Sequence, residues 1–526
     1  MQKNLSLKLL PSEAASESII KEYISKSTGV PLSKVTGFYI TKSSIDARGK
    51  TVWVNLTVHT YINEPFQHRP QLSFDFKNVK KSGRKVIIIG SGPAGLFAAL
   101  KFLEKNIQPI ILERGKDVRA RRRDLAALNK EGVLNPESNY CFGEGGAGTY
   151  SDGKLYTRSS KRGDINRILN LFAHFGAEEN ILYEAHPHIG TNKLPHIITA
   201  MRKTILDCGG LFFFEKKVVG FEIQRDLISK VITSDGNSFE GDAVILATGH
   251  SARDIFQMLQ SKKIKIEAKP FALGVRIEHP QELIDKIQYH GKSWEYFKRE
   301  PFLPPASYSL VEQIKDCGVF SFCMCPGGII APASTNENEL VVNGWSPSKR
   351  NNPYANSGMV VTVEQKHLRA FEKSGELAAM NFQKSVEQKA FQNGGGKYVA
   401  PAQRMVDFTS NKISTDLPDC SYLPGTHSAS LKNVLPDFIY QSLAEAFKEF
   451  GKKMKGYYTN EAIVVATESR TSSPVRIPRS EALLHHPQIK NLYPCGEGAG
   501  FAGGIVSAAM DGERLAETIA SKLAGV

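Results

Sequence analysis

Residues 85–95 read Lys-Val-Ile-Ile-Ile-Gly-Ser-Gly-Pro-Ala-Gly, a β-branched run that leads directly into a glycine-rich turn. The run Val86–Ile89 is apolar at every position, which is typical of a strand buried on both faces of a parallel sheet. Leu96–Lys105 has the apolar pattern of a helix, and Ile107–Leu112 that of a second buried strand. Together these elements make a β-α-β unit of about 30 residues. The sequence therefore predicts an α/β fold organised around this stretch.

The turn between the first strand and the helix has the spacing Gly-x-Gly-x-x-Gly. Gly90 permits the tight turn, Gly92 lets the backbone approach a pyrophosphate, and Gly95 lets the helix pack closely on the strand. An acidic residue, Glu113, ends the second strand and is placed to accept hydrogen bonds from a ribose. The predicted cofactor contacts in this unit are Gly90, Ser91, Gly92, Pro93, Ala94, Gly95, Glu113 and Arg114.

A second match to the same glycine pattern occurs at Gly143–Gly148, but no strand precedes it and no helix follows it. We therefore do not interpret it as a second dinucleotide fingerprint. Glycine is frequent throughout Gly143–Lys154, so backbone amides can crowd against an extended ligand there. The alternative is a flexible surface loop. The predicted contacts here are Gly146, Gly148, Thr149, Ser151 and Lys154.

Two distant segments favour FAD over NAD as the dinucleotide. The apolar strand Ala243–Ala247 ends in a small-residue turn, and Asn491–Pro494 leads into a glycine-rich stretch followed by a helix. FAD is long, so remote segments have to return to hold its ribityl chain and flavin. The predicted helix begins near Gly504, and its positive end would face the flavin. The predicted contacts are Thr248, Gly249, Gly496, Glu497 (for the ribityl hydroxyls), Gly503, Gly504 and Ile505.

These patterns predict a Rossmann-like FAD-binding domain that is split in sequence, with an inserted α+β substrate domain and a small N-terminal α/β module. The expected boundaries are 1–80 for the module, 81–269 and 460–526 for the FAD domain, and 270–459 for the insertion. Within the module we expect the strand Leu5–Leu10, a helix Ser12–Lys26 capped by Ser12, a hairpin of Val35–Ser43 with Thr51–Tyr61, and a linker at Lys77–Arg84.

Three longer motifs resemble those of a known family. The stretch Cys141–Leu155 reads CFGEGGAGTYSDGKL, Phe322–Gly328 reads FCMCPGG, and Glu468–Ile477 reads ESRTSSPVRI. Together with the dinucleotide turn, they resemble uncharacterised bacterial FAD-dependent dehydrogenases, a NAD(P)/FAD-dependent oxidoreductase family within the two-dinucleotide-motif flavoproteins. The resemblance implies a split FAD domain and an inserted family-specific domain, and it leaves the substrate open.

Composition and charge limit the other possibilities. The 526 residues carry a formal net charge of +14, with the densest basic run at Arg114–Arg123. We expect a solvated face for this run, with phosphate contact as the alternative. No apolar run approaches the length of a membrane span, and the N-terminal residues lack a secretory pattern. The seven cysteines do not suggest a disulfide framework, so we expect a cytoplasmic protein.

Cys323 and Cys325 form a C-x-C pair that bears on redox chemistry. On a regular strand, residues two apart lie about 6.5–7 Å apart, at the limit of what a disulfide spans. We therefore expect two unbridged structural cysteines, whereas a redox dithiol beside a flavin would need a bent backbone. No cysteine or histidine spacing indicates a metal site.

The catalytic residues remain unknown, with Arg470, Arg476 and Lys154 as candidates. The two arginines lie before the predicted return strand and can bind a carboxylate or phosphate in bidentate fashion. We therefore predict an anionic small-molecule substrate; the alternative is that one arginine pairs with a carboxylate at a domain interface.

The sequence predicts an FAD-dependent oxidoreductase that transfers two electrons between flavin and substrate. No second strand–glycine turn–helix unit is visible, so NAD(P)H, if it is the donor, would visit the flavin as a transient donor through the substrate cavity; the alternative is another electron donor. Two alternatives remain open, a flavoprotein acting on RNA or another nucleic acid and a non-catalytic FAD scaffold.

Overall fold

The strand that leads into the glycine-rich turn is the central strand of a five-stranded parallel sheet. In the computed structural model, which describes residues 1–157, 162–291 and 298–525, β4 (Lys85–Ile89) leads into α3 (Pro93–Glu104) and β5 (Gln108–Leu112). The strand order is β22-β10-β4-β5-β6, and every pair is parallel. The other strands are β6 (Leu211–Phe213), β10 (Ala243–Leu246) and β22 (Leu492–Pro494). The predicted β-α-β unit and the return of a C-terminal strand are confirmed.

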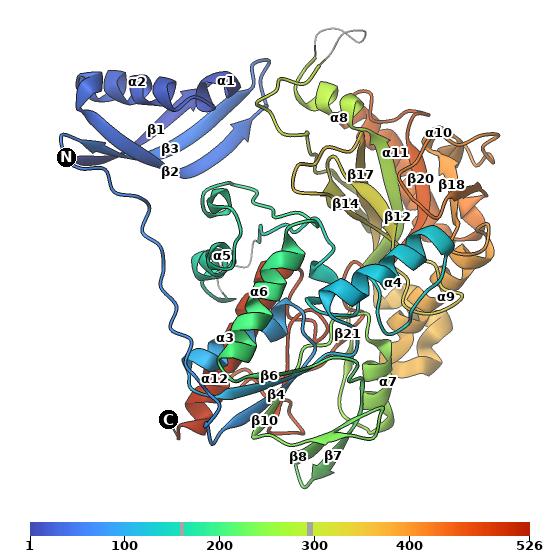
Figure 1. Cartoon of the computed structure of the whole chain (residues 1–526). Coiled ribbons are helices and arrows are strands. Elements are labelled where there is room, and N and C mark those ends of the chain that lie inside the picture. Colours follow the sequence, from blue (N-terminus) through green and yellow to red (C-terminus); the bar gives the residue numbers. More distant parts are fainter. Residues whose placement is uncertain (158–161, 292–297, 526) are drawn as a thin grey trace.

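The alternation of side chains along β4 explains the layers on its two faces. Val86 and Ile88 join a core with α3, α6 (Leu194–Asp207) and α12 (Ile505–Leu523). Ile87 and Ile89 face the opposite core, which α7 (Arg253–Ser261) and a small antiparallel sheet complete. α12 lies alongside α3 (Figure 1). The small sheet contains β7 (Val218–Gln224), β8 (Leu227–Thr233) and β9 (Ser238–Phe239).

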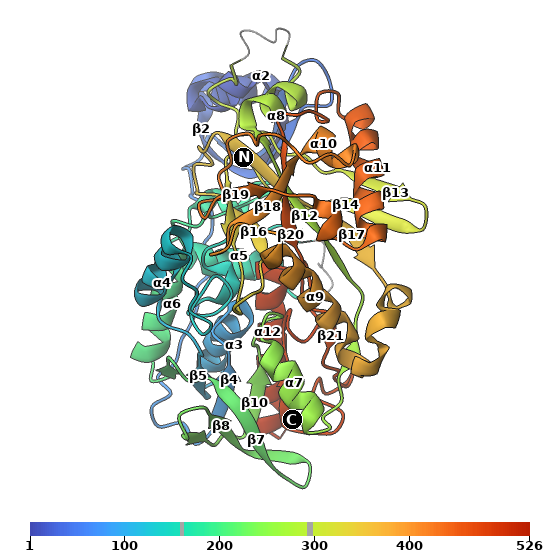
Figure 2. The ribbon, with the colours of Figure 1, turned by 90° about the vertical axis from the view of Figure 1, so that its right-hand side faces the viewer.

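A seven-stranded, mainly antiparallel sheet forms the second large layer, above the parallel sheet in both views (Figure 1 and Figure 2). One pair, β18 with β19, is parallel. Its order is β13 (Val311–Ile314), β14 (Cys317–Cys325), β17 (Tyr354–Val363), β12 (Phe271–Pro280), β20 (Ile463–Glu468), β18 (Ala400–Arg404) and β19 (Thr426–Ser428). The helices α9 (Ala378–Gln392), α10 (Met405–Thr409) and α11 (Asp437–Lys453) pack on it.

This sheet corrects one expected boundary. We predicted that residues 460–526 return to the FAD-binding domain, but β20 pairs with β12 and β18 of the seven-stranded sheet. The chain therefore leaves this sheet only after Glu468. The segment that follows forms the short pair of β11 (Glu267–Ala268) with β21 (Val475–Arg476).

The N-terminal module is a three-stranded antiparallel sheet with two helices on one face (Figure 1). Its strands are β1 (Gln2–Leu9), β2 (Val35–Asp46) and β3 (Trp53–Ile62), so the predicted hairpin is confirmed. The single predicted helix is instead two, α1 (Pro11–Ala14) and α2 (Glu17–Thr28), and the residue that caps the longer one is Ser16, not Ser12. An extended stretch, longer than the expected linker, joins the module to β4.

The remaining elements connect these layers. They are α4 (Val118–Glu131), α5 (Ile165–His174), α8 (Gln281–Gln288), β15 (Ile329–Pro332), β16 (Val342–Trp345) and the 3-10 helices η1 (Leu32–Lys34), η2 (Gly146–Gly148), η4 (Glu179–Leu182), η5 (Gln365–Leu377) and η6 (Leu431–Asn433). Among the described residues, none of the helices combines the length and apolar character that crossing a membrane requires.

Candidate functional site

A cavity of about 440 Å³ lies where the carboxyl ends of the parallel strands meet the seven-stranded sheet. This edge is where open α/β sheets bind their ligands, and the volume is within the range of ligand pockets. Segments that follow β4, β5, β10 and β22 line one part of it. The part toward the seven-stranded sheet is lined by Phe322, Cys323, Asn343, Gly344, Trp345 and Arg470.

The turn after β4 has the geometry that its glycines predict. Gly90 has φ +102°, and a Cβ there would lie 2.5 Å from the carbonyl oxygen of Ala247. A Cβ on Gly95 would lie 2.1 Å from the carbonyl oxygen of Gly90, so this glycine serves helix packing and does not line the cavity. At Gly92, by contrast, the nearest atom to a Cβ is 3.9 Å away. The cavity is therefore open beside Gly92, where a pyrophosphate was expected.

Glu113 lines the cavity, but its carboxylate is occupied by the protein. Oε2 accepts hydrogen bonds from the backbone N–H (3.0 Å) and the hydroxyl (2.6 Å) of Ser91. Oε1 accepts from the N–H groups of Gly115 (2.9 Å) and Gly143 (3.0 Å). A carboxylate offers about four acceptor positions. Glu113 thus joins three loops, and a ribose hydroxyl would have to share one of these positions.

The glycine-rich loop after residue 142 contributes part of the predicted set. Gly146, Gly148, Ser151 and Lys154 line the cavity. Thr149 does not, because its buried hydroxyl donates to the carbonyl of Glu144 at 2.7 Å. The expectation that Thr149 binds ligand is therefore corrected. Lys154 turns toward the seven-stranded sheet and donates to the carbonyl oxygen of Met324, so it does not reach toward the phosphate end.

Arg121 is a residue of this loop system that the sequence prediction missed. It belongs to the basic run that we expected to be a solvated face, yet it is fully buried. Its guanidinium donates to the carbonyl oxygens of Asn139, Tyr140 and Glu144 at 2.8–2.9 Å. Arg121 therefore fixes the loop that carries Gly143–Gly148. Only its place on the apolar side of α4 distinguishes it from the solvated arginines around it.

Arg114, at the other end of the same run, lines the cavity but is paired. Its guanidinium donates to Glu137 (2.6 and 2.8 Å) and to Asp254 (3.0 Å), and it lies 4.0 Å from the ring centre of Phe142. The charge of Arg114 is therefore already paired with carboxylates and is not free to bind a phosphate. Its guanidinium, stacked on Phe142, forms a flat part of the cavity wall.

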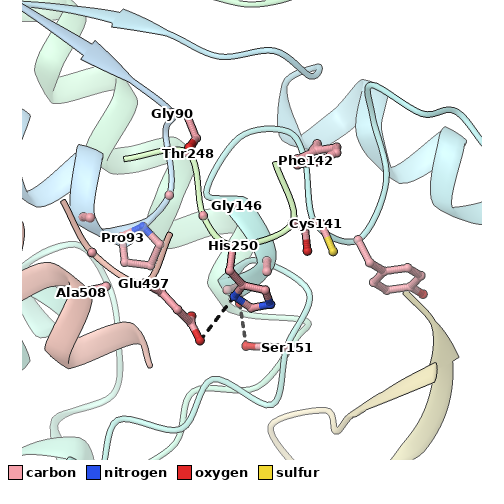
Figure 3. A pocket seen from close by; sticks show the side chains of 18 of the residues that line it. Gly90, Pro93, Cys141, Phe142, Gly146, Ser151, Thr248, His250, Glu497 and Ala508 are labelled. Atoms are coloured by element: carbon pink, nitrogen blue, oxygen red, sulfur yellow. Dashed lines mark hydrogen bonds and ion pairs between the residues drawn. The ribbon is translucent and has the colours of Figure 1, made fainter. Parts of the chain in front are cut away.

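The two remaining turns meet the first one inside the cavity. Glu497 points toward His250, with Oε1 3.5 Å from Nδ1 (Figure 3). A Cβ on Gly249, Gly503 or Gly504 would meet nothing within 4 Å. α12 starts at Ile505 without a side-chain cap, as α3 does at its own start, so both helices present backbone N–H groups to the cavity.

Asp511 and Arg479, which the sequence prediction also missed, hold the last turn in place. Asp511 accepts a hydrogen bond from the N–H of Gly496 (2.8 Å) and a bidentate pair from Arg479 (2.6 and 3.0 Å). Both side chains are almost fully buried. An aspartate on the buried face of α12 was the one sequence signal that pointed to this role.

These features fit FAD. The open space beside Gly92, Gly249, Gly503 and Gly504 forms a continuous glycine-lined cradle that side chains at these positions would fill. Two uncapped helix N-termini favour negative charge at its edges. Pro93, Ala94, Thr248 and Ile505 complete the lining as predicted.

Arg470 lines the cavity, but it is not an open anion site. It donates to Glu387 through Nε (3.2 Å) and Nη2 (3.1 Å) and to Thr335 through Nη1 (2.6 Å). Arg253 at the start of α7 binds the same carboxylate at 2.8 and 2.9 Å. Burial opposes ionisation of Glu387, but the two arginines outweigh it and lower its pKa to about 2. The expectation that Arg470 binds a substrate anion is therefore corrected. Arg470 fits the alternative, in which the arginine pairs with a carboxylate at a domain interface.

Arg476 lies outside the cavity lining. It is exposed and stacks on the ring of Phe501, with 4.9 Å between the guanidinium carbon and the ring centre. The sequence proximity of Arg470 and Arg476 therefore does not bring them to the same site.

The two cysteines of the C-x-C pair differ in exposure. Cys323 is half-buried and lines the cavity, whereas Cys325 is buried. Lys154 Nζ lies 3.7 Å from Cys323 Sγ and 3.8 Å from Cys325 Sγ. Within the described part of the chain, no group of three or more His, Cys, Asp or Glu side chains is placed to hold a metal ion.

Comparison with known proteins gives matches along most of the chain. Residues 270–471 match a family described as "FAD-dependent protein, C-terminal domain-like", and residues 1–61 match a domain of unknown function (DUF8436). A Clostridium beijerinckii protein described as uncharacterized is 38% identical over an alignment of 523 positions, which covers 96% of this chain and 96% of that protein. The FAD-dependent match confirms the predicted cofactor.

Solved structures show weaker similarity. The 2,6-dihydroxypyridine-3-hydroxylase of Arthrobacter nicotinovorans is 12% identical, with 84% of this chain and 86% of that chain covered and a TM-score of 0.36. The flavin-dependent brominase Bmp2 is 12% identical, with 84% and 79% covered and a TM-score of 0.37. Similarity at this level does not identify a shared reaction.

Proposed function

The chain belongs to the same protein family as the Clostridium beijerinckii relative, and we propose that it is an FAD-dependent oxidoreductase acting on a small molecule by two-electron transfer. One observation carries this proposal. A single cavity is lined on one side by glycine turns suited to FAD and on the other by β14 of the seven-stranded sheet and by β16 of a two-stranded sheet. A substrate that enters from the second side would lie against the cofactor.

FAD, when bound, supplies the two-electron chemistry, and the protein supplies position and electrostatics. The N–H groups at the start of α3 would bind the pyrophosphate of FAD beside Gly92. The N–H groups at the start of α12 would stabilise negative charge on the flavin. Phe322 and Trp345 provide apolar surface at the substrate side of the cavity and exclude water from it.

NAD(P)H remains our proposed electron donor, as a visitor to the same cavity. The sequence has one strand–glycine turn–helix unit, and the cradle that it forms is the one that fits FAD. A nicotinamide would therefore approach from the side of the seven-stranded sheet.

The charges around the cavity argue against the predicted anionic substrate. Every lysine and arginine among the described lining residues has an acidic partner. The pairs are Arg114–Glu137, Lys154–Asp152, Lys216–Asp235, Lys217–Glu137 and Arg470–Glu387. We therefore propose a substrate without a strongly anionic group.

The absorbance spectrum of the purified protein, followed by anaerobic titration with NADH and NADPH, tests the function. We expect the spectrum of an oxidised flavin, release of FAD and not FMN by acid, and bleaching by one of the two nucleotides. A colourless protein that takes up no added FAD would contradict the proposed function. A yellow protein that neither nucleotide reduces would remove only the proposed donor.

A further inference from the structure

β14 bends at its carboxyl end, at the C-x-C pair. Its pairing with β17 shifts register between Phe322 and Cys325, and Cys323 adopts φ +47°. A positive φ is uncommon for a residue other than glycine, and such backbone conformations concentrate at functional sites. Bulged strands also redirect side chains beside active sites. The bend therefore removes the regular strand geometry that would keep the two thiols apart.

Cys323 and Cys325 contact each other directly at this bend. Cys325 Sγ lies 3.3 Å from the carbonyl oxygen of Cys323 and donates to it. The neighbouring Cys325 thiol and the charges of Lys154 and Arg276 outweigh burial and lower the pKa of Cys323 well below its usual range. The contact with Cys323 and burial raise the pKa of Cys325. These shifts favour the thiolate form at Cys323 and the thiol form at Cys325.

Two cations face the sulfurs from different elements. Lys154 approaches both sulfurs from the glycine-rich loop, and its pKa is raised because the negative charges beside it, those of Cys323 and Asp152 among them, outweigh the effect of burial. Arg276, fully buried on β12, donates through Nη2 to the carbonyl of Cys323 (2.7 Å) and to Cys325 Sγ (3.5 Å). Its Nη1 binds Glu468 at 2.9 Å. Electropositive, partly exposed surroundings of this kind are those of reactive cysteines rather than structural ones.

The two cysteines lie at different depths relative to the cavity. Cys323 lines the same cavity as the turn Gly503–Gly504 and the start of α12, whereas Cys325 lies behind it. The outer sulfur can exchange with a group in the cavity, and the inner sulfur can close a disulfide with it. This is the arrangement that thiol–disulfide exchange needs.

We propose that Cys323 and Cys325 form a redox-active dithiol that exchanges two electrons with the flavin. A sulfur–sulfur bond forms between the two residues and the S–H bond of Cys325 breaks. The pair gives up two electrons and one proton, and oxidised FAD takes up both electrons and the proton to become the anionic reduced flavin. In the opposite direction, the reduced flavin returns them and cleaves the disulfide. The inference rests on the proposed function, because it requires FAD in the cavity.

Anaerobic titration with dithionite tests the exchange directly. We expect the air-oxidised protein to take up twice as many electrons as its FAD content requires. Cys323→Ser and Cys325→Ser should each take up only the electrons of FAD. Cys208→Ser is the matched control, since this cysteine contacts Phe76 outside the cavity, and it should titrate like the wild type.

A mass-spectrometric readout does not depend on activity. After alkylation without reductant and cleavage by chymotrypsin between Cys317 and Cys323, the peptide that contains Cys323 and Cys325 should be unalkylated and lighter by two hydrogens in the oxidised wild type. After reduction it should carry two alkyl groups. If the oxidised protein takes up only the electrons of FAD and both cysteines are alkylated, the dithiol proposal is wrong and the proposed function stands.

The peptide masses and the FAD content together distinguish failure of the dithiol proposal from failure of the proposed function. If the protein binds no FAD, the proposed function fails, and the dithiol–flavin exchange fails with it. A glutathione redox buffer then shows whether the FAD-free pair still closes a disulfide. Because the wild type alone gives the electron count and the peptide masses, misfolding of a serine variant does not prevent a decision.

Discussion

The hydroxyl of Ser91 donates a 2.6 Å hydrogen bond to Oε2 of Glu113, and both side chains are buried. The bond joins the turn after β4 to the end of β5. Through Oε1 the same carboxylate holds the loop at Gly143. A position that sequence patterns associate with ribose recognition therefore also holds together the backbone of the cofactor cradle.

Replacement of Glu113 by Gln should loosen this cradle. The amide nitrogen cannot accept from two of the four donors, and each lost hydrogen bond to a charged group costs about 1.5–3 kcal/mol. We expect a lower free energy of unfolding and weaker FAD binding, measured by denaturant titration and by fluorescence titration with FAD. Glu131→Gln, at an exposed position on α4, is the control. Unchanged stability and FAD affinity in Glu113→Gln would show that the bonds to Glu113 are unimportant.

Replacement of Gly92 by Val should abolish FAD binding without unfolding the protein. A Cβ at this position meets only Gly146 at 3.9 Å, so the valine fits the protein but occupies the space of the pyrophosphate. Gly83→Val in the linker, where a Cβ meets nothing within 4 Å, should keep its FAD. The flavin content of each purified variant decides the outcome. A folded, yellow Gly92→Val protein would mean that the turn is misassigned.

The β-α-β unit was predictable because local sequence determines it. A buried parallel strand requires an apolar run, and the turn requires glycine at Gly90, where φ is positive. The return of β22 was predictable for the same reason. The place of β20 was not predictable, because its residues 463–466 are apolar and would suit either sheet. Only tertiary pairing with β12 determines its place.

The site residues likewise divide into those that local sequence determines and those that tertiary contacts determine. Turn residues such as Gly92 lie where the pattern predicts, but partners of charged side chains could not be inferred. In the sequence, Arg121 looks like a solvent-facing cation and Arg470 like a substrate-binding one. Arg121 instead donates to backbone carbonyls of the loop that follows α4, and Arg470 pairs with Glu387, 83 residues earlier in the chain. The bend at Cys323 was equally inaccessible, since nothing in C-x-C requires a positive φ.

The ionised carboxylate of Asp152 should stabilise the folded protein, and this contribution should be lost in acid. Burial opposes its ionisation, but the charges of Lys154 and Arg350 outweigh this effect and lower its pKa from 3.8 to about 2. The contribution is therefore complete above pH 3.8 and is lost as the pH falls through about 2. We expect Asp152→Asn to lower the free energy of unfolding by about 2 kcal/mol near neutral pH, with the difference from wild type shrinking in this acid window. Denaturant titrations at several pH values measure this effect.

The exposed Asp207, which pairs with Lys203 on the surface of α6, provides the comparison. Asp207→Asn should change the stability little at any pH, because surface ion pairs contribute about 0–1 kcal/mol. A difference between wild type and Asp152→Asn that stays constant down to the lowest pH would show that the loss comes from packing and not from the charge.

The buried group of Arg253, Arg470, Glu339 and Glu387 should behave as structure rather than as a substrate site. Removal of Arg470 leaves the buried negative charge of Glu387 only partly neutralised. Breaking a buried ion pair typically lowers the free energy of unfolding by about 3–5 kcal/mol. We expect Arg470→Ala to unfold at much lower denaturant concentration than wild type. Arg476→Ala is the matched control, six residues later in the sequence, where the exposed side chain contributes about 0.5–1 kcal/mol through the ring of Phe501. If Arg470→Ala is as stable as wild type but has a raised KM, Arg470 binds substrate and the structural assignment is wrong. If both variants lose stability only slightly and keep their kinetics, the ion-pair group does not hold the α7 segment and the seven-stranded sheet together.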